Sequence, residues 1–204
     1  MREARSPGRR SADEAARTRR AILDNALRLF SEKGFDLTSV REIAAASDIS
    51  HGVLRYHFGS KMDIWISVMD RAFDLYREEM MPVVEAAVDS DNALEAFRKV
   101  VSVFIRLTCE RPEFARLFIR ETSQQGPRAD YCQANFSALH LAIGELFNRA
   151  RSQSSALEFH SNDSFFYALM SLTHFRLLHP GVAFAPELQD SEQVQALVMK
   201  VLFR

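Results

Sequence analysis

The side chains best suited to chemistry in this sequence lie in one short run, ISHGVLRYHFGSK, from Ile49 to Lys61. The run combines imidazole, guanidinium, phenol and ammonium groups with a glycine. Arginine and lysine bind phosphate oxygens, and arginine also pairs with guanine. A core helix does not need these polar groups, and a surface helix does not need the aromatic ones. We therefore expect a helix that contacts a partner through one face and is held to its own domain by Ile49, Leu54 and Phe58.

The elements around this run are all expected to be helices. Apolar residues recur at helical spacing almost throughout, and the 204 residues include only 7 Gly and 6 Pro, so we predict an all-α protein. A first helix is expected over 14–33, where Gly34 ends it. The arginine-rich residues 1–12 are expected to form a disordered basic arm, whose charge suggests contact with nucleic acid.

Two serines are positioned to start the next helices. Ser39 and Glu42 form the sequence pattern of a capping box, so a short helix is expected there. Ser50 can cap a third helix about four residues later, and two helices with so tight a turn form a helix-turn-helix. Asp48 lies in the turn, where a residue must adopt positive φ, and Asp tolerates this better than most residues do. A long fourth helix is expected from Ser60 toward Pro82.

The run TRRAILDNALRLFSEKGFDLTSVREIAAASDISHGVLRYHFGSKMDI, Thr18–Ile64, resembles the DNA-binding head of TetR-type transcriptional regulators. Many residues agree at the spacings of that family, among them S-x-G-x-L and H-F-x-S-K at the end of the run. Two residues depart from the family pattern, because Asp48 replaces the usual turn glycine and Arg55 replaces a usual tyrosine. The resemblance implies an N-terminal three-helix helix-turn-helix head and a larger C-terminal helical domain that binds a ligand and dimerises.

The resemblance also implies which residues contact DNA. Arg41 is expected to contact a base or a phosphate, and Lys61 corresponds to the family's phosphate-binding lysine; the alternative is that both are ordinary surface cations. Gly52 lets the backbone approach DNA closely, and Ser50 begins a helix N-terminus that suits a phosphate. The other contacts are expected from side chains of the third helix, with Val53 on a thymine methyl and Arg55 on guanine: His51, Val53, Arg55, Tyr56 and His57.

The aromatic content of the second half suggests a small-molecule pocket. Most of the 16 Phe follow residue 90, in helices expected over 92–110, 112–123 and 129–152. The resemblance implies that this region binds an effector, which changes the spacing of two DNA-binding heads. The alternative is an ordinary aromatic core. We expect a mostly apolar pocket, and hence a lipophilic effector, with contributions from Phe104, Phe118, Tyr131, Phe136 and His140.

The last two helices are expected to join two copies of the chain. The helix over 191–203 has a regular apolar stripe, and the helix over 165–178 is apolar nearly all round, with the small residues Ala168 and Ser171. The run HPGVAFAP between them is expected to be a loop. Helix-turn-helix proteins usually bind DNA as dimers, and the resemblance implies a homodimer through a four-helix bundle of these two helices from each copy.

These features define three expected segments, namely an arm (1–12), a DNA-binding domain (13–60) and a ligand-binding and dimerisation domain (61–204). Cys109 and Cys132 are expected to be reduced core thiols. The histidines and cysteines lack the spacing of a zinc helix, and no nucleophile motif is present, so we expect no metal, no cofactor and no catalysis. The sequence contains no apolar run long enough to span a bilayer and no secretory signal, which favours a cytoplasmic protein without a membrane partner.

Together these features predict a ligand-responsive transcriptional regulator, most simply a repressor. It would bind a palindromic double-stranded DNA operator as a dimer and leave it when a small molecule binds. The alternative is a helical ligand- or partner-binding protein whose DNA head has drifted out of use. Salt-sensitive binding to DNA would distinguish the two, because phosphate contacts lose affinity steeply as salt rises.

Overall fold

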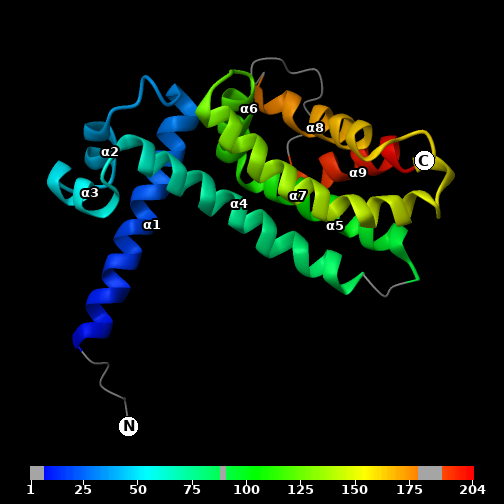
Figure 1. Cartoon of the computed structure of the whole chain (residues 1–204), viewed down its shortest axis with the longest axis horizontal. Helices are drawn as coiled ribbons and strands as arrows, with labels where there is room; N and C mark the ends of the chain where they lie inside the picture. Colours follow the sequence, from blue (N-terminus) through cyan, green and yellow to red (C-terminus); the bar gives the residue numbers. More distant parts are fainter. Residues whose placement is uncertain (1–6, 88–90, 179–189) are drawn as a thin grey trace, which may run out of the picture. The chain divides into compact units, whose positions relative to one another are not determined.

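The computed structural model describes residues 7–87, 91–178 and 190–204, with side chains placed from residue 14 onward. The described residues form helices and no strand, which confirms the all-α prediction (Figure 1). The expected loop at 179–186 and the first six residues of the expected arm lie outside them. In chain order the elements are α1 (Pro7–Lys33), α2 (Val40–Ala46), α3 (His51–Phe58), α4 (Lys61–Ala86), α5 (Ala93–Glu110), α6 (Pro112–Thr122), α7 (Pro127–Arg151), the short 3₁₀ helix η1 (Ser155–Leu157), α8 (Asn162–Leu178) and α9 (Ser191–Leu202).

The chain divides into two compact units within α4, one up to Arg71 and one from Ala72 onward. We had expected the second domain to start at residue 61. The first turns of α4 belong to the N-terminal unit because they bury Ile64, Trp65 and Val68. A single helix is therefore shared by both units.

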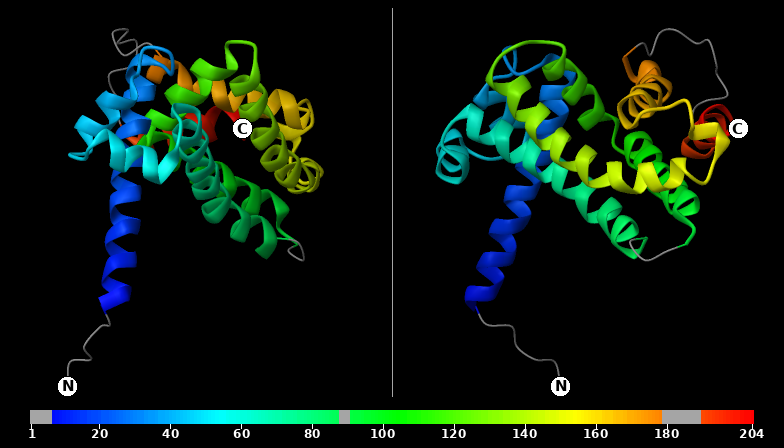
Figure 2. Two further views of the ribbon diagram at one scale, coloured as in Figure 1. Left: turned by 60° about the vertical axis from the view of Figure 1, so that its left-hand side comes forward. Right: turned by 45° about the vertical axis from the view of Figure 1, so that its right-hand side comes forward.

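The N-terminal unit, which we call the head, packs α1, α2, α3 and the first turns of α4 around a small apolar core. α2 contacts both α1 and α3 (Figures 1 and 2). α1 begins at Pro7, so the prediction of a disordered arm was wrong for residues 7–12. Proline is favoured at the first position of a helix, and the alanines and arginines that follow are strong helix formers. The core side chains of the head include Ile22, Ala26, Phe30, Ile43, Leu54, Phe58 and Trp65.

The C-terminal unit is built around α5, which contacts α6, α7, α8 and α9 (Figure 2). The ring of Phe97 lies 5.4 Å from that of Phe147, 5.1 Å from that of Phe165 and 6.0 Å from that of Phe203, so part of the aromatic content forms an ordinary core cluster. The five helices expected after residue 90 are all present, with small differences at their ends. None of the described helices is long and apolar enough to cross a membrane.

Candidate functional site

Serine caps determine where the helices of the helix-turn-helix begin. The Ser39 N–H donates to Glu42 Oε2 at 2.8 Å and the Glu42 N–H donates to Ser39 Oγ at 3.2 Å, which confirms the capping box. Lys33 Nζ donates to Glu42 Oε1 at 2.6 Å, and this bond, together with that from Ser39, lowers the pKa of Glu42 to about 2. At the start of α3, Ser50 Oγ accepts from the Val53 N–H at 3.2 Å.

Asp48 makes the turn between α2 and α3. Its φ is 53°, and no other non-glycine residue of the described chain has a positive φ. The Asp48 N–H donates to Ala45 O at 3.2 Å and the Ile49 N–H donates to Ala44 O at 3.1 Å, so the turn also closes the end of α2. The prediction that aspartate replaces the usual turn glycine at positive φ is confirmed.

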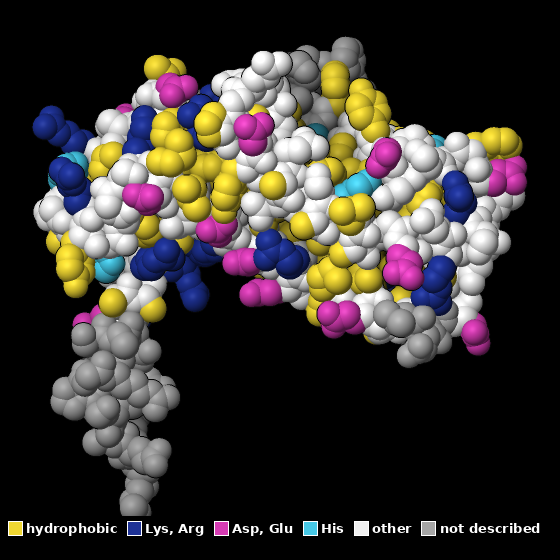
Figure 3. All heavy atoms as spheres, in the orientation of Figure 1, with side chains coloured by type: hydrophobic (Ala, Val, Ile, Leu, Met, Phe, Trp, Pro, Cys, Tyr) yellow, Lys and Arg dark blue, Asp and Glu magenta, His cyan; other side chains and the backbone are white. Residues whose placement is uncertain are grey.

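α3 has one buried face and one exposed face. Leu54 and Phe58 are buried, as predicted, while Ile49 just before the helix is only half-buried. Tyr56 is 89% exposed, which is unusual for so large an aromatic side chain. Basic and histidine side chains lie on the surface at the α2–α3 end of the head (Figure 3). Of the other predicted contacts, His57 and Lys61 are half-buried. The rest are exposed, namely Arg41, Ser50, His51, Gly52, Val53 and Arg55.

Gly52 is not required by the fold of the head. A Cβ atom placed at this position would meet only Ser50 Oγ, at 3.8 Å, which is an ordinary contact distance. Glycine inside a helix is less stable than alanine by roughly 1 kcal/mol. The head would therefore tolerate or favour a side chain at this position.

The ammonium group of Lys61 is held inside the head. Lys61 Nζ donates to Phe35 O at 2.9 Å and to Thr38 O at 3.0 Å, with a third contact to Asp36 O at 3.5 Å. It also lies 4.3 Å from the centre of the Phe35 ring, within cation–π range. In the free protein this lysine ties the start of α4 to the connection between α1 and α2, so a phosphate contact would have to compete with these acceptors.

We expect Lys61→Ala to lower the free energy of unfolding by about 2 kcal/mol, because hydrogen bonds from a charged group are lost and carbonyl acceptors are left without their donor. Urea unfolding followed by circular dichroism measures this change, with the exposed Lys99→Ala as the matched control. A different result would identify Lys61 as a phosphate contact only. In that case stability is unchanged, and the slope of the logarithm of DNA affinity against the logarithm of salt concentration falls by about one.

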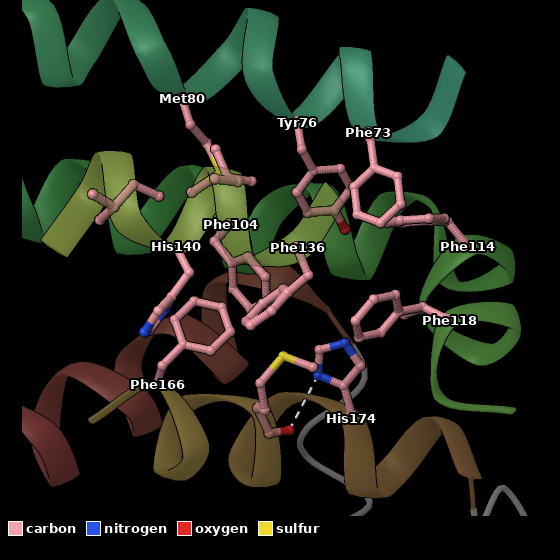
Figure 4. Close-up of a pocket in the computed structure, with 14 residues that line it drawn as sticks. Phe73, Tyr76, Met80, Phe104, Phe114, Phe118, Phe136, His140, Phe166 and His174 are labelled. Carbon is pink, nitrogen blue, oxygen red and sulfur yellow. Dashed lines mark hydrogen bonds between the residues drawn. The ribbon is translucent and has the colours of Figure 1, made fainter. Parts of the chain in front are cut away.

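The C-terminal unit contains a small aromatic cavity between α4, α5, α6, α7 and α8 (Figure 4). Its volume is about 40 Å³, which is room for a few water molecules. Pockets for small-molecule ligands measure roughly 300–1,000 Å³, so side chains must move apart before such a ligand can enter. The lining residues are Phe73, Tyr76, Met80, Phe104, Phe114, Ala115, Phe118, Phe136, Leu139, His140, Ile143, Phe166, Met170 and His174.

The cavity brings together four of the five residues expected at a ligand pocket, namely Phe104, Phe118, Phe136 and His140. Tyr131 does not line it. On α7 the lining side chains repeat at three- and four-residue intervals from Phe136. Tyr131 lies five positions before Phe136, which turns it about 140° around the helix axis.

The sequence analysis missed the walls of the cavity that come from α4 and α8. Phe73, Tyr76 and Met80 are spaced three and four residues apart, so their common face was visible as a pattern. Phe166, Met170 and His174 repeat every four residues in a helix that is apolar nearly all round, which hid the distinction between cavity, core and surface.

His174 is one of the buried polar side chains of the cavity. Its Nδ1 lies 2.8 Å from Thr173 Oγ1 and 3.1 Å from Met170 O. Met170 O can only accept, and the Thr173 hydroxyl lies 2.8 Å from Leu169 O, to which it can donate. The proton of the neutral ring is therefore assigned to Nδ1, and Nε2 is an acceptor. Figure 4 shows this second nitrogen on the cavity side of the ring.

His140 lies near the edge of the cavity and has different neighbours. Its Nε2 lies 2.8 Å from Asp163 Oδ1 and 2.9 Å from Asn162 Nδ2, both at the start of α8. Its ring stacks on Phe136 at a centroid distance of 5.5 Å. Hydrogen bonds from outside the cavity thus hold His140 in place, while its ring forms part of the cavity wall.

His174 should make the protein acid-sensitive. Burial lowers its pKa from 6.5 to about 4, so between these values the unfolded chain binds a proton that the folded chain does not. The free energy of unfolding that depends on neutral His174 is fully present above about pH 6.5. It decreases as the pH falls toward 4. We expect a loss of about 2 kcal/mol between pH 7 and pH 5.

Chemical unfolding at the two pH values measures this loss. His174→Gln should remove that part of the pH dependence, and His160→Gln should retain it. Parallel pH dependences for wild type and His174→Gln would contradict the assignment.

The cysteines offer no reactive thiolate. Cys109 and Cys132 are not paired with each other. Burial raises the pKa of both thiols, that of Cys132 to about 12, so both are protonated at neutral pH. Within the described residues, no three His, Cys, Asp or Glu side chains are grouped in a way that could hold a metal ion.

Comparison with known proteins identifies the head. Residues 22–68 match the sequence profile of the bacterial regulatory proteins of the tetR family. The chain is also 31% identical over 115 residues to the HTH-type transcriptional repressor BepR of Brucella suis, which covers 55% of this chain and 54% of BepR. It is 29% identical over 128 residues to the HTH-type transcriptional repressor NicS of Pseudomonas putida, with 63% of this chain and 58% of NicS covered. The head therefore belongs to the tetR family. The regions that align with this chain span little more than half the length of BepR and of NicS.

Solved structures extend the likeness in fold to most of the chain. AibR, in a crystal structure with isovaleryl coenzyme A and operator DNA, superposes with a TM-score of 0.72 at 22% identity, over 91% of this chain and 98% of that one. A mutant of HlyIIR superposes with a TM-score of 0.73 at 19% identity, over 93% and 98% of the two chains. At such low identity these structures establish the fold alone, a helix-turn-helix head followed by a helical domain.

Proposed function

We propose that this TetR-family protein is a DNA-binding transcriptional regulator and not an enzyme. The observation that carries the proposal is α3, which is capped by Ser50, anchored through Leu54 and Phe58, and exposes Arg55 and Tyr56. The second helix of a helix-turn-helix enters the major groove of DNA. We place the protein in the cytoplasm, where bacterial operator DNA lies.

The proposed roles of the DNA-contacting residues follow the chemistry of their side chains. Arg55 reads a guanine and Val53 packs on a thymine methyl, as their chemistry allows. Gly52 permits close approach of the helix, which accounts for a glycine that the head itself does not need. The remaining members of the proposed contact surface bind phosphates, sugars or further bases: Arg41, Ser50, His51, Tyr56, His57 and Lys61.

We propose a homodimer through α8 and α9. On α8, Tyr167 is 78% exposed and Phe175 is 53% exposed, and Ser171 lies between them at four-residue spacing. On α9, Val201 is 54% exposed. Large apolar side chains that recur on one helix face indicate a protein contact, and a two-fold dimer presents two recognition helices to a palindrome.

The effector is proposed to act through α4. This helix runs without interruption from Lys61 in the head to Ala86, and it contributes Phe73, Tyr76 and Met80 to the cavity. We propose that a ligand that widens the cavity pushes on this helix. By linkage, the ligand weakens DNA binding by the same factor by which DNA weakens ligand binding. BepR and NicS are named as repressors, so we propose repression that the effector relieves.

The test is a selection of random double-stranded DNA by the purified full-length protein, followed by footprinting of the selected sequence. The proposal requires an enriched inverted repeat whose halves are protected together, and affinity that falls steeply with salt. No enriched sequence, with ligand binding retained, would favour a ligand-binding protein with a non-functional head.

A further inference from the structure

The cavity is uncharged. Among the described residues that line it there is no Asp, Glu, Lys or Arg, and its polar groups are the Tyr76 hydroxyl and the imidazoles of His140 and His174. A buried carboxylate, phosphate or ammonium group needs an opposite charge nearby, and its transfer from water is otherwise very unfavourable. The part of a ligand that enters this cavity must therefore be neutral.

The three polar groups differ in what they offer a ligand. Tyr76 Oη lies 3.3 Å from Thr108 Oγ1 and is thus engaged within the protein. His140 Nε2 is turned to Asp163 and Asn162. His174 donates through Nδ1 to its own helix and presents Nε2, a hydrogen-bond acceptor, toward the cavity (Figure 4). A ligand group that meets His174 must consequently be a donor, such as a hydroxyl or an N–H.

The walls favour a flat ring. The ring centroid of Phe104 lies 5.5 Å from that of Phe166 and 5.9 Å from that of His174. The ring centroid of Phe136 lies 5.7 Å from that of Phe118 and 5.1 Å from that of Phe166. These ring pairs are tilted or edge-on, which is a favourable geometry for aromatic groups. An aromatic ligand that separates them replaces each lost ring contact with a similar one, and Met170 can adapt its flexible side chain.

We infer that the cavity binds an uncharged aromatic molecule bearing a hydroxyl or N–H group, which donates a hydrogen bond to His174 Nε2. The inference rests on the proposed function in taking this cavity as the effector site. It excludes ligands whose buried end is a carboxylate, and it predicts that ligands of equal shape without a donor bind more weakly.

The test uses three probes of similar shape: 2-naphthol, which has a donor; 2-methoxynaphthalene, which has only an acceptor; and 2-naphthoate, which is charged. Equilibrium dialysis against the full-length protein, without DNA, gives the three dissociation constants. We expect 2-naphthol to bind at least about tenfold more tightly than either other probe, since a buried acceptor left without its donor weakens binding by about that factor.

Two variants assign the preference to one residue. His174→Phe keeps a ring at the site but removes the acceptor, so it should abolish the preference for 2-naphthol over 2-methoxynaphthalene. His160→Phe makes the same change outside the cavity and should retain the preference. Circular dichroism identifies a misfolded variant. Should His174→Phe misfold, His174→Leu takes its place, because it also lacks an acceptor, and it should likewise abolish the preference.

Three results would overturn the inference: no binding of 2-naphthol to the wild-type protein, equal or tighter binding of either other probe, or an unchanged preference in a folded His174 variant. Because DNA is absent, these results are independent of whether the head reads an operator. A protein that selects no DNA sequence could still bind 2-naphthol as described. A protein that does not bind 2-naphthol could still select an operator.

Discussion

Gly52→Leu is expected to weaken operator binding about a hundredfold while leaving the head folded. A base contact contributes roughly 1–3 kcal/mol of discrimination, and a leucine that holds α3 away from the groove removes more than one contact. Gly52 is exposed, and a Cβ atom at this position meets only Ser50 Oγ at 3.8 Å, so the isolated head does not oppose the substitution there. Leucine also has a higher helix propensity than glycine, so thermal stability should rise slightly.

The two opposite effects make this variant informative. A loss of binding with lower stability would indicate damage to the head, whereas a loss with equal or higher stability indicates a steric conflict with DNA. Ala142→Leu, an exposed position on α7, is the matched control and should leave DNA binding unchanged. Operator affinity equal to wild type in Gly52→Leu would show that α3 does not lie close to the DNA.

Ser171→Arg is expected to convert the proposed dimer into monomers and to reduce operator affinity by more than about tenfold. Ser171 lies between the exposed Tyr167 and Phe175, and its hydroxyl donates to Tyr167 O at 2.9 Å, so a small, internally satisfied residue occupies the middle of this helix face. An arginine there would bury an uncompensated charge in the interface. Loss of the dimer separates two half-site contacts that otherwise reinforce each other.

Sedimentation velocity at matched protein concentrations measures the change in mass. Ser123→Arg is the control, because the Ser123 hydroxyl also donates to a carbonyl of its own chain, Arg120 O at 2.9 Å, and the residue is exposed at the end of α6. It should remain dimeric. If both variants sediment as dimers, the contact between copies lies elsewhere on the C-terminal unit.

The local features of the head could be predicted from the sequence because short-range interactions determine them. A serine cap needs only a partner three residues away, as in Ser39 with Glu42, and the positive φ of Asp48 follows from the need to end one helix and begin another within a few residues. The burial of Leu54 and Phe58 follows from helical spacing alone.

Features that depend on tertiary packing could not be predicted in the same way. Lys61 was assigned to a phosphate by its place in the motif, but the carbonyl groups that surround its ammonium group come from a connection more than twenty residues earlier. The cavity uses side chains from five helices, and the apolar pattern of α8 does not indicate which face lines the cavity and which is exposed. Tyr131 was assigned by residue type and does not line the cavity, because its helix turns it away.

The measurement that tests the central claim most directly is fluorescence anisotropy of the selected operator DNA with wild-type protein and with Arg55→Ala, at two salt concentrations. Arg55 is exposed on α3, so the substitution leaves the core of the head intact. We predict tight, strongly salt-dependent binding by the wild type, and a loss of roughly tenfold or more, or a changed base preference, in Arg55→Ala. Weak binding that is insensitive to salt and equal in the two proteins would contradict the account, because α3 would then not read DNA.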